Sequence, residues 1–312
     1  MPKSKKPVTF TNSFKKPNPS QINNKIKTPA LKQLIQNGGI KQNYKNPNSI
    51  IREYHNLNKR KAIIKSKLDS LPNKQNDTQI KVLILEQTEI DLKLDALGGL
   101  DAYQKSSLLG QSTKKGGDTS RYLIKHLFNI NFLPSLNPIK LLDVGSLSPN
   151  NYEKEKKWIK TDCIDLNSQH PKISKLDFFD VPLSNPDNNS EISVHGPYDI
   201  VSLSLVVNFE GDIHKRGQML IHAAKLLIEK PGILFLVLPL PCITNSRYFN
   251  EQRLLDIACA VGFEELLSSH HSTKLAYYIF RLSNKQKHVS HPQFKKTLLK
   301  DGPGKNNFCI AL

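Results

Sequence analysis

The second half of the chain alternates short, almost fully apolar runs with stretches of helical spacing. The apolar runs predict β-strands at residues 139–144, 158–166, 173–176, 198–207, 232–239, 264–267 and 275–282. Apolar positions three and four apart predict helices at residues 217–229 and 250–261. Apolar strands that alternate with helices are typical of a mostly parallel sheet covered on both faces. We therefore expect an α/β fold around a seven-stranded, mostly parallel sheet.

The first half carries the spacing of helices. Residues 48–70 and 77–97 place apolar side chains at helical intervals, and Leu71-Pro72-Asn73 separates the two stretches. Two helices joined by a short break predict an antiparallel hairpin. The first helix is basic at Lys59-Arg60-Lys61, which is either a solvated face or a nucleic-acid contact. A connector and a short helix at residues 119–129 follow.

These patterns divide the chain into four parts. Residues 1–30 hold seven lysines, five prolines and no acid, which predicts a disordered basic tail. Residues 31–130 form a helical region with the hairpin, and residues 131–284 form the α/β domain. Residues 285–312 are basic and poor in apolar side chains, which predicts a basic C-terminal tail.

The charge of the chain narrows its class of partner. Lys and Arg number 45 against 27 Asp and Glu, so the net charge is +18 and the pI about 9.6. Such an excess favours a polyanion, with nucleic acid the first candidate and an anionic membrane the second. The sequence contains no run of about 18 apolar residues, so we expect no membrane-spanning helix. The lysine-rich N-terminus lacks the apolar segment of a secretory signal.

Cysteine and histidine spacing argues against a metal site. The four cysteines form no C-x-x-C pair, so neither a disulfide framework nor a zinc site is expected, and a reducing intracellular compartment fits best. The histidines show no metal-ligand spacing with cysteines or acids, so we expect no metal.

The ends of the predicted strands supply the candidate ligand site, because a parallel sheet binds its ligand beyond the carboxyl ends of its strands. Gly145 follows the first strand, and Asp165 ends the second strand 20 residues later. The glycine lets the backbone approach a ligand, and the acid accepts hydrogen bonds from ribose hydroxyls. The third strand offers Asp177 and Phe178 for the edge and face of an adenine. The fourth strand offers Ser204 and Leu205.

The glycine count discriminates between cofactors. A dinucleotide fingerprint needs G-x-G-x-x-G, whose second glycine admits a pyrophosphate, but Ser146 and Leu147 follow Gly145 here. S-adenosylmethionine carries a ribose and an adenine but no phosphate. The pattern therefore favours this methyl donor. The alternative is a plain turn glycine with an unrelated surface aspartate, and the agreement of four strand ends weighs against it.

Three motifs resemble the fungal 25S ribosomal RNA adenine-N1 methyltransferase family. They are YDIVSLSLVVNF at residues 198–209, RGQML at 216–220 and LVLPLPCITNSRY at 236–248. The segment IDLNSQHP at residues 164–171 is similar to the second-strand signature of that family. The resemblance covers roughly residues 95–285, and the motif at 236–248 is unusual among methyltransferases.

The resemblance implies a class I (Rossmann-like) methyltransferase fold with an N-terminal helical extension, and donor contacts at Gly145 and Asp165. It also implies methylation of N1 of one adenine in large-subunit rRNA, by a protein located in the nucleus, within the nucleolus. The expected partner is that rRNA or a pre-ribosomal particle, with no membrane and with the chain as a monomer. The family is related to a metazoan S-adenosylmethionine sensor upstream of the TOR kinase, so a non-catalytic binding module is the alternative.

The chemistry of N1 methylation points to the residues after the fourth and fifth strands. N1 has a lone pair in the ring plane, so positioning and water exclusion matter more than a base. Asn208 is a candidate for the adenine edge, and Phe209 or Tyr248 for stacking. Arg247 is expected to be functional, either for a phosphate or for a local carboxylate. The Asn/Asp-Pro-Pro-aromatic run of N6-adenine enzymes is absent after the fourth strand, where Asn208-Phe209-Glu210-Gly211 stands instead.

Overall fold

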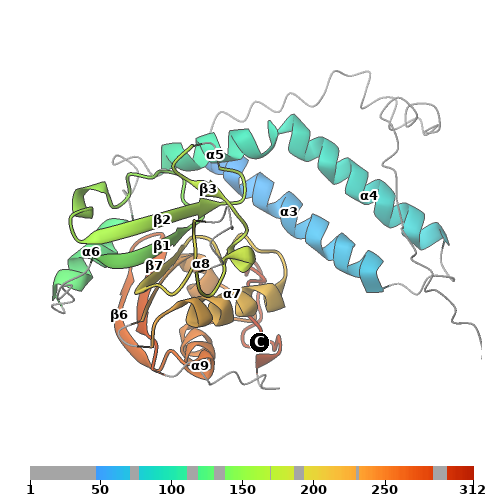
Figure 1. Cartoon of the computed structure of the whole chain (residues 1–312). Helices are drawn as coiled ribbons and strands as arrows, with labels where there is room; N and C mark the ends of the chain where they lie inside the picture. The colour runs from blue at the N-terminus through green and yellow to red at the C-terminus, as the bar shows by residue number, and fades with distance from the viewer. Residues whose placement is uncertain are drawn as a thin grey trace, which may run out of the picture. The chain divides into compact units, whose positions relative to one another are not determined.

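A computed structural model describes residues 47–70, 77–110, 119–129, 138–168, 170–185, 193–229, 232–283 and 294–312 (Figure 1). Residues 44–312 belong to one compact unit. The predicted basic tail at residues 1–30 and the first part of the predicted helical region lie outside the described residues.

A seven-stranded sheet forms the centre of the α/β domain, in the order β3-β2-β1-β4-β5-β7-β6. Its strands are β1 (Ile139–Val144), β2 (Ile159–Asp165), β3 (Ser174–Lys175), β4 (Ile200–Ser204), β5 (Ile233–Pro239), β6 (Glu265–His271) and β7 (Leu275–Arg281). The pairs among β1 to β5 are parallel, and β7 runs antiparallel to both β5 and β6. The predicted α/β fold with a seven-stranded, mostly parallel sheet is confirmed, and this strand order is that of class I methyltransferases.

Side chains alternate between the two faces of each strand, and apolar side chains on both faces pack into two separate cores. In β5, Leu234, Leu236 and Leu238 face one core, while Phe235 and Val237 face the other. The first core is completed by α7 (Ile213–Leu226) and α9 (Glu251–Val261), and the second by α6 (Ser120–Asn129).

The two helices of the first core begin at polar caps. The Asp212 carboxylate accepts hydrogen bonds from the backbone N–H groups of His214 and Lys215, and the Asn250 side chain accepts one from Arg253. Helix α9 ends at Gly262, which adopts a φ of 111°. Short helical turns complete the connections: η1 (Glu153–Glu155), η2 (Phe178–Asp180) and α8 (Leu240–Thr244).

The N-terminal helical region consists of α3 (Pro47–Ser70), α4 (Asp77–Ala96) and α5 (Gly99–Gly110), with α3 and α4 side by side (Figure 1). A small core between them contains Leu57, Ile64, Ile90 and Leu97. The predicted basic face of α3 is partly neutralised within the pair. Arg60 contacts Glu86 at 2.5 Å and Lys61 contacts Asp91 at 2.6 Å.

The end of the chain packs against the α/β domain. Residues 308–311 are buried, and the Phe308 carbonyl accepts a 2.6 Å hydrogen bond from Ser246 Oγ. A Cβ at Gly217 of α7 would lie 2.1 Å from the Ala311 carbonyl oxygen, so this helix approaches the segment closely because it carries a glycine there. The sequence pattern predicted a tail at residues 285–312. The structure places the described part, residues 294–312, against the domain, and we call it the C-terminal segment.

Candidate active site

The strand register brings the predicted donor residues into one row. Val144 pairs with Ile164, Asp143 pairs with Ser202, and Ile164 pairs with Ser174. Gly145 and Asp165 each follow the pair Val144–Ile164 by one position, and Gly145 and Ser204 each follow the pair Asp143–Ser202 by two. Gly145, Asp165 and Ser204 therefore lie at the same level. All three therefore lie at the carboxyl edge of the parallel strands, where α/β sheets bind ligands. We call these three residues the donor row.

Gly145 occupies a position that only glycine fits well. Its φ is +69°, in the left-handed region. A Cβ there would lie 3.0 Å from Cγ2 of Val206, a residue of the segment after β4. The next residue, Ser146, donates its backbone N–H to the Ile164 carbonyl at 3.0 Å. The chain thus turns tightly over the end of β1 and keeps the strand end open.

Asp165 is oriented by its own turn. Its Oδ1 accepts a 2.8 Å hydrogen bond from the backbone N–H of Asn167. Burial raises the pKa of this half-buried carboxyl, and the bond from Asn167 opposes the shift in part. A carboxylate held this way is suited to accept hydrogen bonds from the two hydroxyls of a ribose.

Asp177 and Phe178 lie where the third strand ends, with different roles for their side chains. The Asp177 carboxylate caps η2 by accepting a 3.0 Å bond from the backbone N–H of Phe179. The Phe178 ring is buried and meets the His222 ring edge-on, with centroids 4.9 Å apart. The Phe178 ring therefore packs against α7, which leaves the backbone of this turn as the part that can contact an adenine edge.

Ser204 and Leu205 complete the site at the end of β4. The Ser204 hydroxyl lies 2.8 Å from the Thr119 hydroxyl, which ties the start of α6 to the strand end. Leu205 has a φ of 59°, in the left-handed region that costs a non-glycine residue about 1–3 kcal/mol. Its backbone N–H donates to the Val237 carbonyl at 2.9 Å. The predicted strand at 198–207 ends early because of this turn, which directs the following residues across the sheet edge.

Asn208 is a buried amide with an unused acceptor. Its side chain is 8% exposed, and Oδ1 has no hydrogen-bond partner among the described residues. Buried polar groups are paired in the great majority of cases, so this unpaired oxygen is a candidate acceptor for a ligand. Asn208 lies four residues after Ser204, the last residue of the donor row along the chain.

Phe209 is held by rings from the N-terminal helices. Its ring centroid lies 4.0 Å from that of His55 in α3 and 5.4 Å from that of Tyr103 in α5. Tyr54 stacks on Tyr103 at 4.7 Å. Burial, and then the charge of Lys59, lower the pKa of His55 to about 4, so its ring is neutral at pH 7. The expected stacking role of Phe209 is therefore filled by protein rings.

Helix α3 also contacts the loop after Phe209. A Cβ at Gly211 would lie 2.6 Å from Cβ of Ala62, so the glycine allows α3 to approach the loop. The half-buried thiol of Cys242 lies within electrostatic range of Lys59 and Arg216. Burial raises the pKa of Cys242 to about 11, although both cations oppose the shift.

Arg247 and Tyr248 lie against the C-terminal segment. The Arg247 guanidinium donates to the carbonyls of Gly302, at 3.0 Å, and Lys305, and it lies 3.5 Å from the Asp301 carboxylate. Of the two expected partners, a phosphate or a local carboxylate, the structure supplies the carboxylate. The Tyr248 ring has Lys296 Nζ 4.3 Å from its centroid.

Several site residues could not be found from the sequence. His55 and Tyr103, on α3 and α5, and Thr119, just before α6, lie in segments that no motif marks as functional. Among the residues that the structure covers, no group of three or more His, Cys, Asp or Glu is placed to hold a metal ion. No helix in the described ranges is long and apolar enough to cross a membrane.

The chain resembles solved methyltransferase structures at low identity. One is the 1,6-didemethyltoxoflavin-N1-methyltransferase of Burkholderia thailandensis with bound S-adenosylhomocysteine. It matches at a TM-score of 0.39 and 10% identity, over 58% of this chain and 87% of that chain. Another is the N-methyltransferase NodS of Bradyrhizobium japonicum, at a TM-score of 0.34 and 12% identity, over 56% and 93%.

Curated relatives and a family model match far more specifically. A protein from Schizosaccharomyces pombe named 25S rRNA adenine-N(1) methyltransferase is 35% identical over 271 residues, which cover 84% of this chain and 90% of the relative. A 25S rRNA (adenine(2142)-N(1))-methyltransferase from Saccharomyces cerevisiae is 34% identical over 225 residues, or 70% of this chain and 62% of the relative. The model of a family described as "25S rRNA (adenine(2142)-N(1))-methyltransferase, Bmt2" matches residues 88–310. The chain belongs to this family.

Proposed function

We propose that this chain transfers the methyl group of S-adenosylmethionine to N1 of one adenine in large-subunit (25S) rRNA. The observation that carries the proposal is that the range matched by the family model, residues 88–310, contains both the donor row and Asn208. The named relatives are 25S rRNA adenine-N1 methyltransferases. No observation favours the non-catalytic sensor as an alternative.

The donor row supplies contacts that suit this cofactor. Gly145 lets the backbone pass close to the donor, and Asp165 accepts hydrogen bonds from the ribose hydroxyls. Asp177 fixes the turn whose backbone, at Phe178, contacts the adenine edge of the donor. Ser204 and Leu205 border the methionine half. Nothing in this set requires the second glycine that a pyrophosphate would need.

The transfer itself needs alignment more than acid–base chemistry. The N1 lone pair attacks the methyl carbon, the new C–N bond forms as the C–S bond breaks, and the electron pair returns to sulfur. The donor becomes a neutral thioether and the adenine becomes cationic. Holding the two reactants in line and free of water is the main contribution of the protein.

Asn208 is the residue we assign to the target adenine. The free Oδ1 is an acceptor, and the 6-amino group beside N1 is a donor, so a hydrogen bond between them orients N1. The same oxygen lies near the positive charge that develops on the ring and stabilises it. Because N1 lies on the Watson–Crick edge, the adenine must be unpaired or flipped out to reach Asn208.

Tyr248 and Arg247 complete the assignment. With Phe209 occupied by His55 and Tyr103, Tyr248 is the aromatic side chain we assign to stacking on the target base. Lys296 Nζ lies over one face of the Tyr248 ring, so we assign the target base to the opposite face. Arg247 acts through the C-terminal segment and is a positioning residue for Tyr248.

The cellular setting follows from the substrate. A methyltransferase of large-subunit rRNA works in the nucleus, and we place this chain in the nucleolus, on a pre-ribosomal particle, as a monomer. The net charge of +18 suits such a polyanionic partner.

The test is a methylation assay with the purified full chain, in vitro transcribed 25S rRNA and S-adenosylmethionine, followed by mass spectrometry of the nucleosides. We expect 1-methyladenosine at one position. The Gly145→Arg variant serves as the negative control. Absence of 1-methyladenosine with both naked rRNA and isolated pre-ribosomal particles, from a chain that binds the donor, would overturn the proposal in favour of a sensor.

A further inference from the structure

The connection between β1 and β2 lacks the helix that usually joins parallel strands. Residues 145–158 contain one short turn, η1, and Tyr152 is the residue that packs the connection onto the sheet. Helix α6 covers the same face through Leu123 and Leu127. With no full helix in the connection, a space stays open between it and α6.

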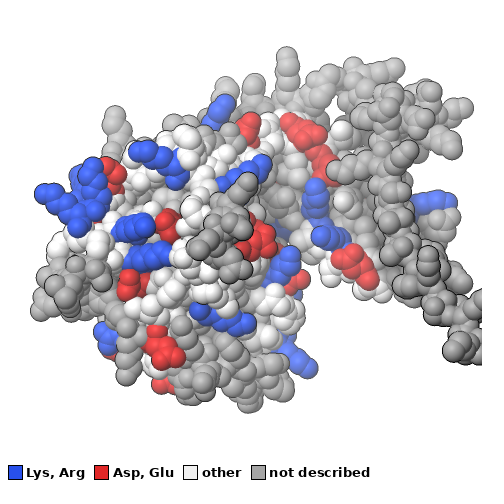
Figure 2. All heavy atoms as spheres, viewed as in Figure 1, with Lys and Arg blue, Asp and Glu red and all other residues white. Residues whose placement is uncertain are grey.

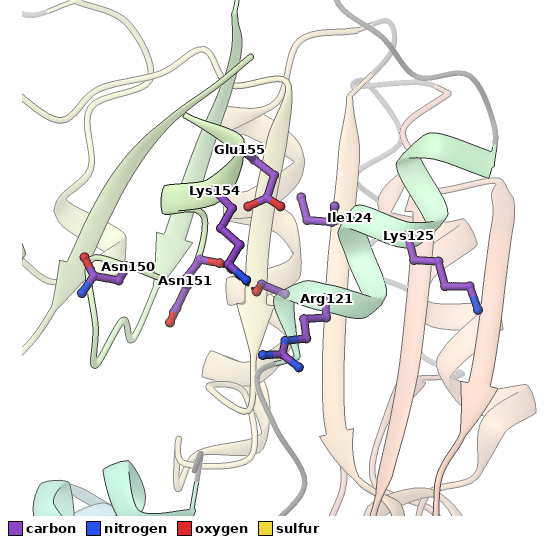
Figure 3. Close-up of a pocket in the computed structure, with 8 residues that line it drawn as sticks. Arg121, Ile124, Lys125, Asn150, Asn151, Lys154 and Glu155 are labelled. Carbon is purple, nitrogen blue, oxygen red and sulfur yellow. Dashed lines mark hydrogen bonds between the residues drawn. The ribbon is translucent and has the colours of Figure 1, made fainter. Parts of the chain in front are cut away.

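This space is a pocket of about 390 Å³ (Figure 3). Its lining comes from α6 and from the connection: Ser120, Arg121, Ile124, Lys125, Asn150, Asn151, Lys154 and Glu155. In Figure 3, Arg121 from α6 and Lys154 from the connection extend toward the same space, while Lys125 points away from it. We call this the α6 pocket.

The charges in the α6 pocket are unbalanced. Arg121 and Lys154, the two cations that extend into it, form no ion pair with any described residue, and Glu155 is the one acid of the lining. The basic face of α3 differs, because Arg60 and Lys61 are paired with acids of α4. Figure 2 shows basic side chains gathered over the end of the molecule where β2 begins, and Lys156, Lys157 and Lys160 of that region are exposed.

Two hydrogen bonds connect the α6 pocket to the donor row. Ser120 follows Thr119, whose hydroxyl lies 2.8 Å from that of Ser204. On the other wall, Asn151 Nδ2 donates to the Asp143 carboxylate at 3.1 Å, two residues before Gly145. The walls of the α6 pocket are therefore joined to the ends of β1 and β4, the strands that contribute Gly145 and Ser204.

The geometry points to the α6 pocket as a binding site for backbone phosphates of the substrate RNA, next to the methylated nucleotide. Guanidinium, ammonium and carboxamide N–H groups are the donors that contact phosphate oxygens, and they position a strand without reading its sequence. The inference rests on the proposed function, since it needs an RNA substrate. It adds the surface that holds the strand outside the target-base site.

The test is the salt dependence of RNA binding by the double variant Arg121→Gln/Lys154→Gln. Affinity for a 25S rRNA fragment spanning the target adenine is measured by fluorescence anisotropy over a range of salt. In single-stranded RNA each phosphate contact contributes about 0.7 to the slope of log affinity against log salt. We expect the slope to become shallower by about 1.4, affinity at low salt to fall, and the calorimetric affinity for S-adenosylmethionine to stay unchanged.

Two controls make the result specific. Lys225→Gln/Lys274→Gln removes the same charge from exposed positions on α7 and beside the β6–β7 turn, and should leave the slope unchanged. Arg121→Lys/Lys154→Arg keeps the charge and should bind RNA as the unaltered chain does. The donor titration also verifies that each variant is folded.

The inference is overturned if the slope of the double variant is unchanged, or if the control lysines lower it equally. It is also overturned if donor affinity falls, because the pocket would then hold the donor carboxylate. Failure of the proposed function looks different, since the unaltered chain would then produce no 1-methyladenosine at all.

Discussion

The donor half and the target half of the active site are built in different ways. The donor row of Gly145, Asp165 and Ser204 comes from the ends of neighbouring parallel strands, and the sheet register alone aligns it. Next to Asn208, the residue that we assign to the target base, Phe209 is held by the rings of His55 and Tyr103, from helices outside the sheet. The donor half is positioned by the sheet alone, whereas the target half depends on contacts between segments that lie far apart in the chain.

This difference implies that the two halves can fail separately. Changes at the strand ends should remove donor binding and, with it, methylation. Changes in the contact between α3 and the loop after β4 should lower methylation and leave donor binding intact. Helix α3 also lies outside residues 88–310, the range that the family model matches. The target half thus uses a part of the chain that the family match does not include.

The largest expected effect is that of Gly145→Arg. A side chain at a φ of +69° adds about 1–3 kcal/mol of backbone strain, and its Cβ would lie 3.0 Å from Val206. We expect donor affinity, measured by calorimetry, to fall by roughly a hundred-fold or more. Gly304→Arg is the matched control, because Gly304 has a φ of +74° with no atom within 4 Å of a built Cβ. Normal donor affinity in Gly145→Arg would break the assignment of the donor row.

Asn208→Ala should separate the halves. It removes the acceptor for the 6-amino group, a loss of about 1–3 kcal/mol, so the methylation rate at saturating donor should fall roughly 10- to 100-fold. Donor affinity should remain within about two-fold. Asn208→Asp keeps an acceptor and should lose less activity than the alanine variant. An equal loss of donor binding in Asn208→Ala would move this residue into the donor half.

Gly211→Ala tests whether α3 holds the target half. The new Cβ would lie 2.6 Å from Cβ of Ala62, so the helix and the loop must separate. We expect the methylation rate to fall about ten-fold, since small misplacements near reacting groups are costly, with donor affinity unchanged. Ala62→Gly in the same chain removes the clash and should restore activity. If the second change gives no rescue, the packing of α3 is not the cause.

The smallest effect expected is a pH dependence through His55. Its pKa is lowered to about 4 in the folded chain, against about 6.5 when exposed. Between these values the unfolded chain binds a proton that the folded chain does not, so stability is intact above pH 6.5 and falls as the pH drops toward 4. At pH 5 the loss should be roughly 1–2 kcal/mol in urea unfolding.

His55→Phe provides the comparison for this titration. Phenylalanine keeps a ring against Phe209 and has no proton to bind, so the fall in stability between pH 6.5 and 5 should be smaller than in the unaltered chain. An identical pH dependence in the two chains would show that His55 does not titrate in the contact.

The alignment of the donor row at one edge of the sheet could be predicted from the sequence because its signals are local. An apolar run that ends in Gly145, and a second that ends in Asp165, suffice to place both residues at one edge of a parallel sheet. The fold class followed from the same alternation of strands and helices. The early end of β4 was missed, because a leucine at a φ of 59° is not a residue that favours the left-handed region.

The target half could not be predicted in the same way, because its contacts join residues far apart in the chain. The contact of His55 with Phe209 spans 154 residues (209 − 55), and neither residue carries a pattern that names the other. The basic, apolar-poor composition of residues 285–312 predicts a tail, but the described part of this range packs against the domain. Its packing depends on Gly217, on Ser246 and on the 2.6 Å bond from Arg216 to the Cys309 carbonyl, 93 residues away.

The environment of Cys242 makes the position of α3 measurable. Its thiol is half-buried near Lys59, and its pKa of about 11 keeps it protonated and slow toward alkylating reagents at pH 8. Separation of α3 from the loop would return water to the sulfur and lower that pKa toward its ordinary value. The alkylation rate of Cys242, followed by mass spectrometry of the peptide, therefore reports the fraction of molecules in which α3 contacts the loop after β4. A change in this rate when rRNA is added would show that rRNA binding shifts that fraction.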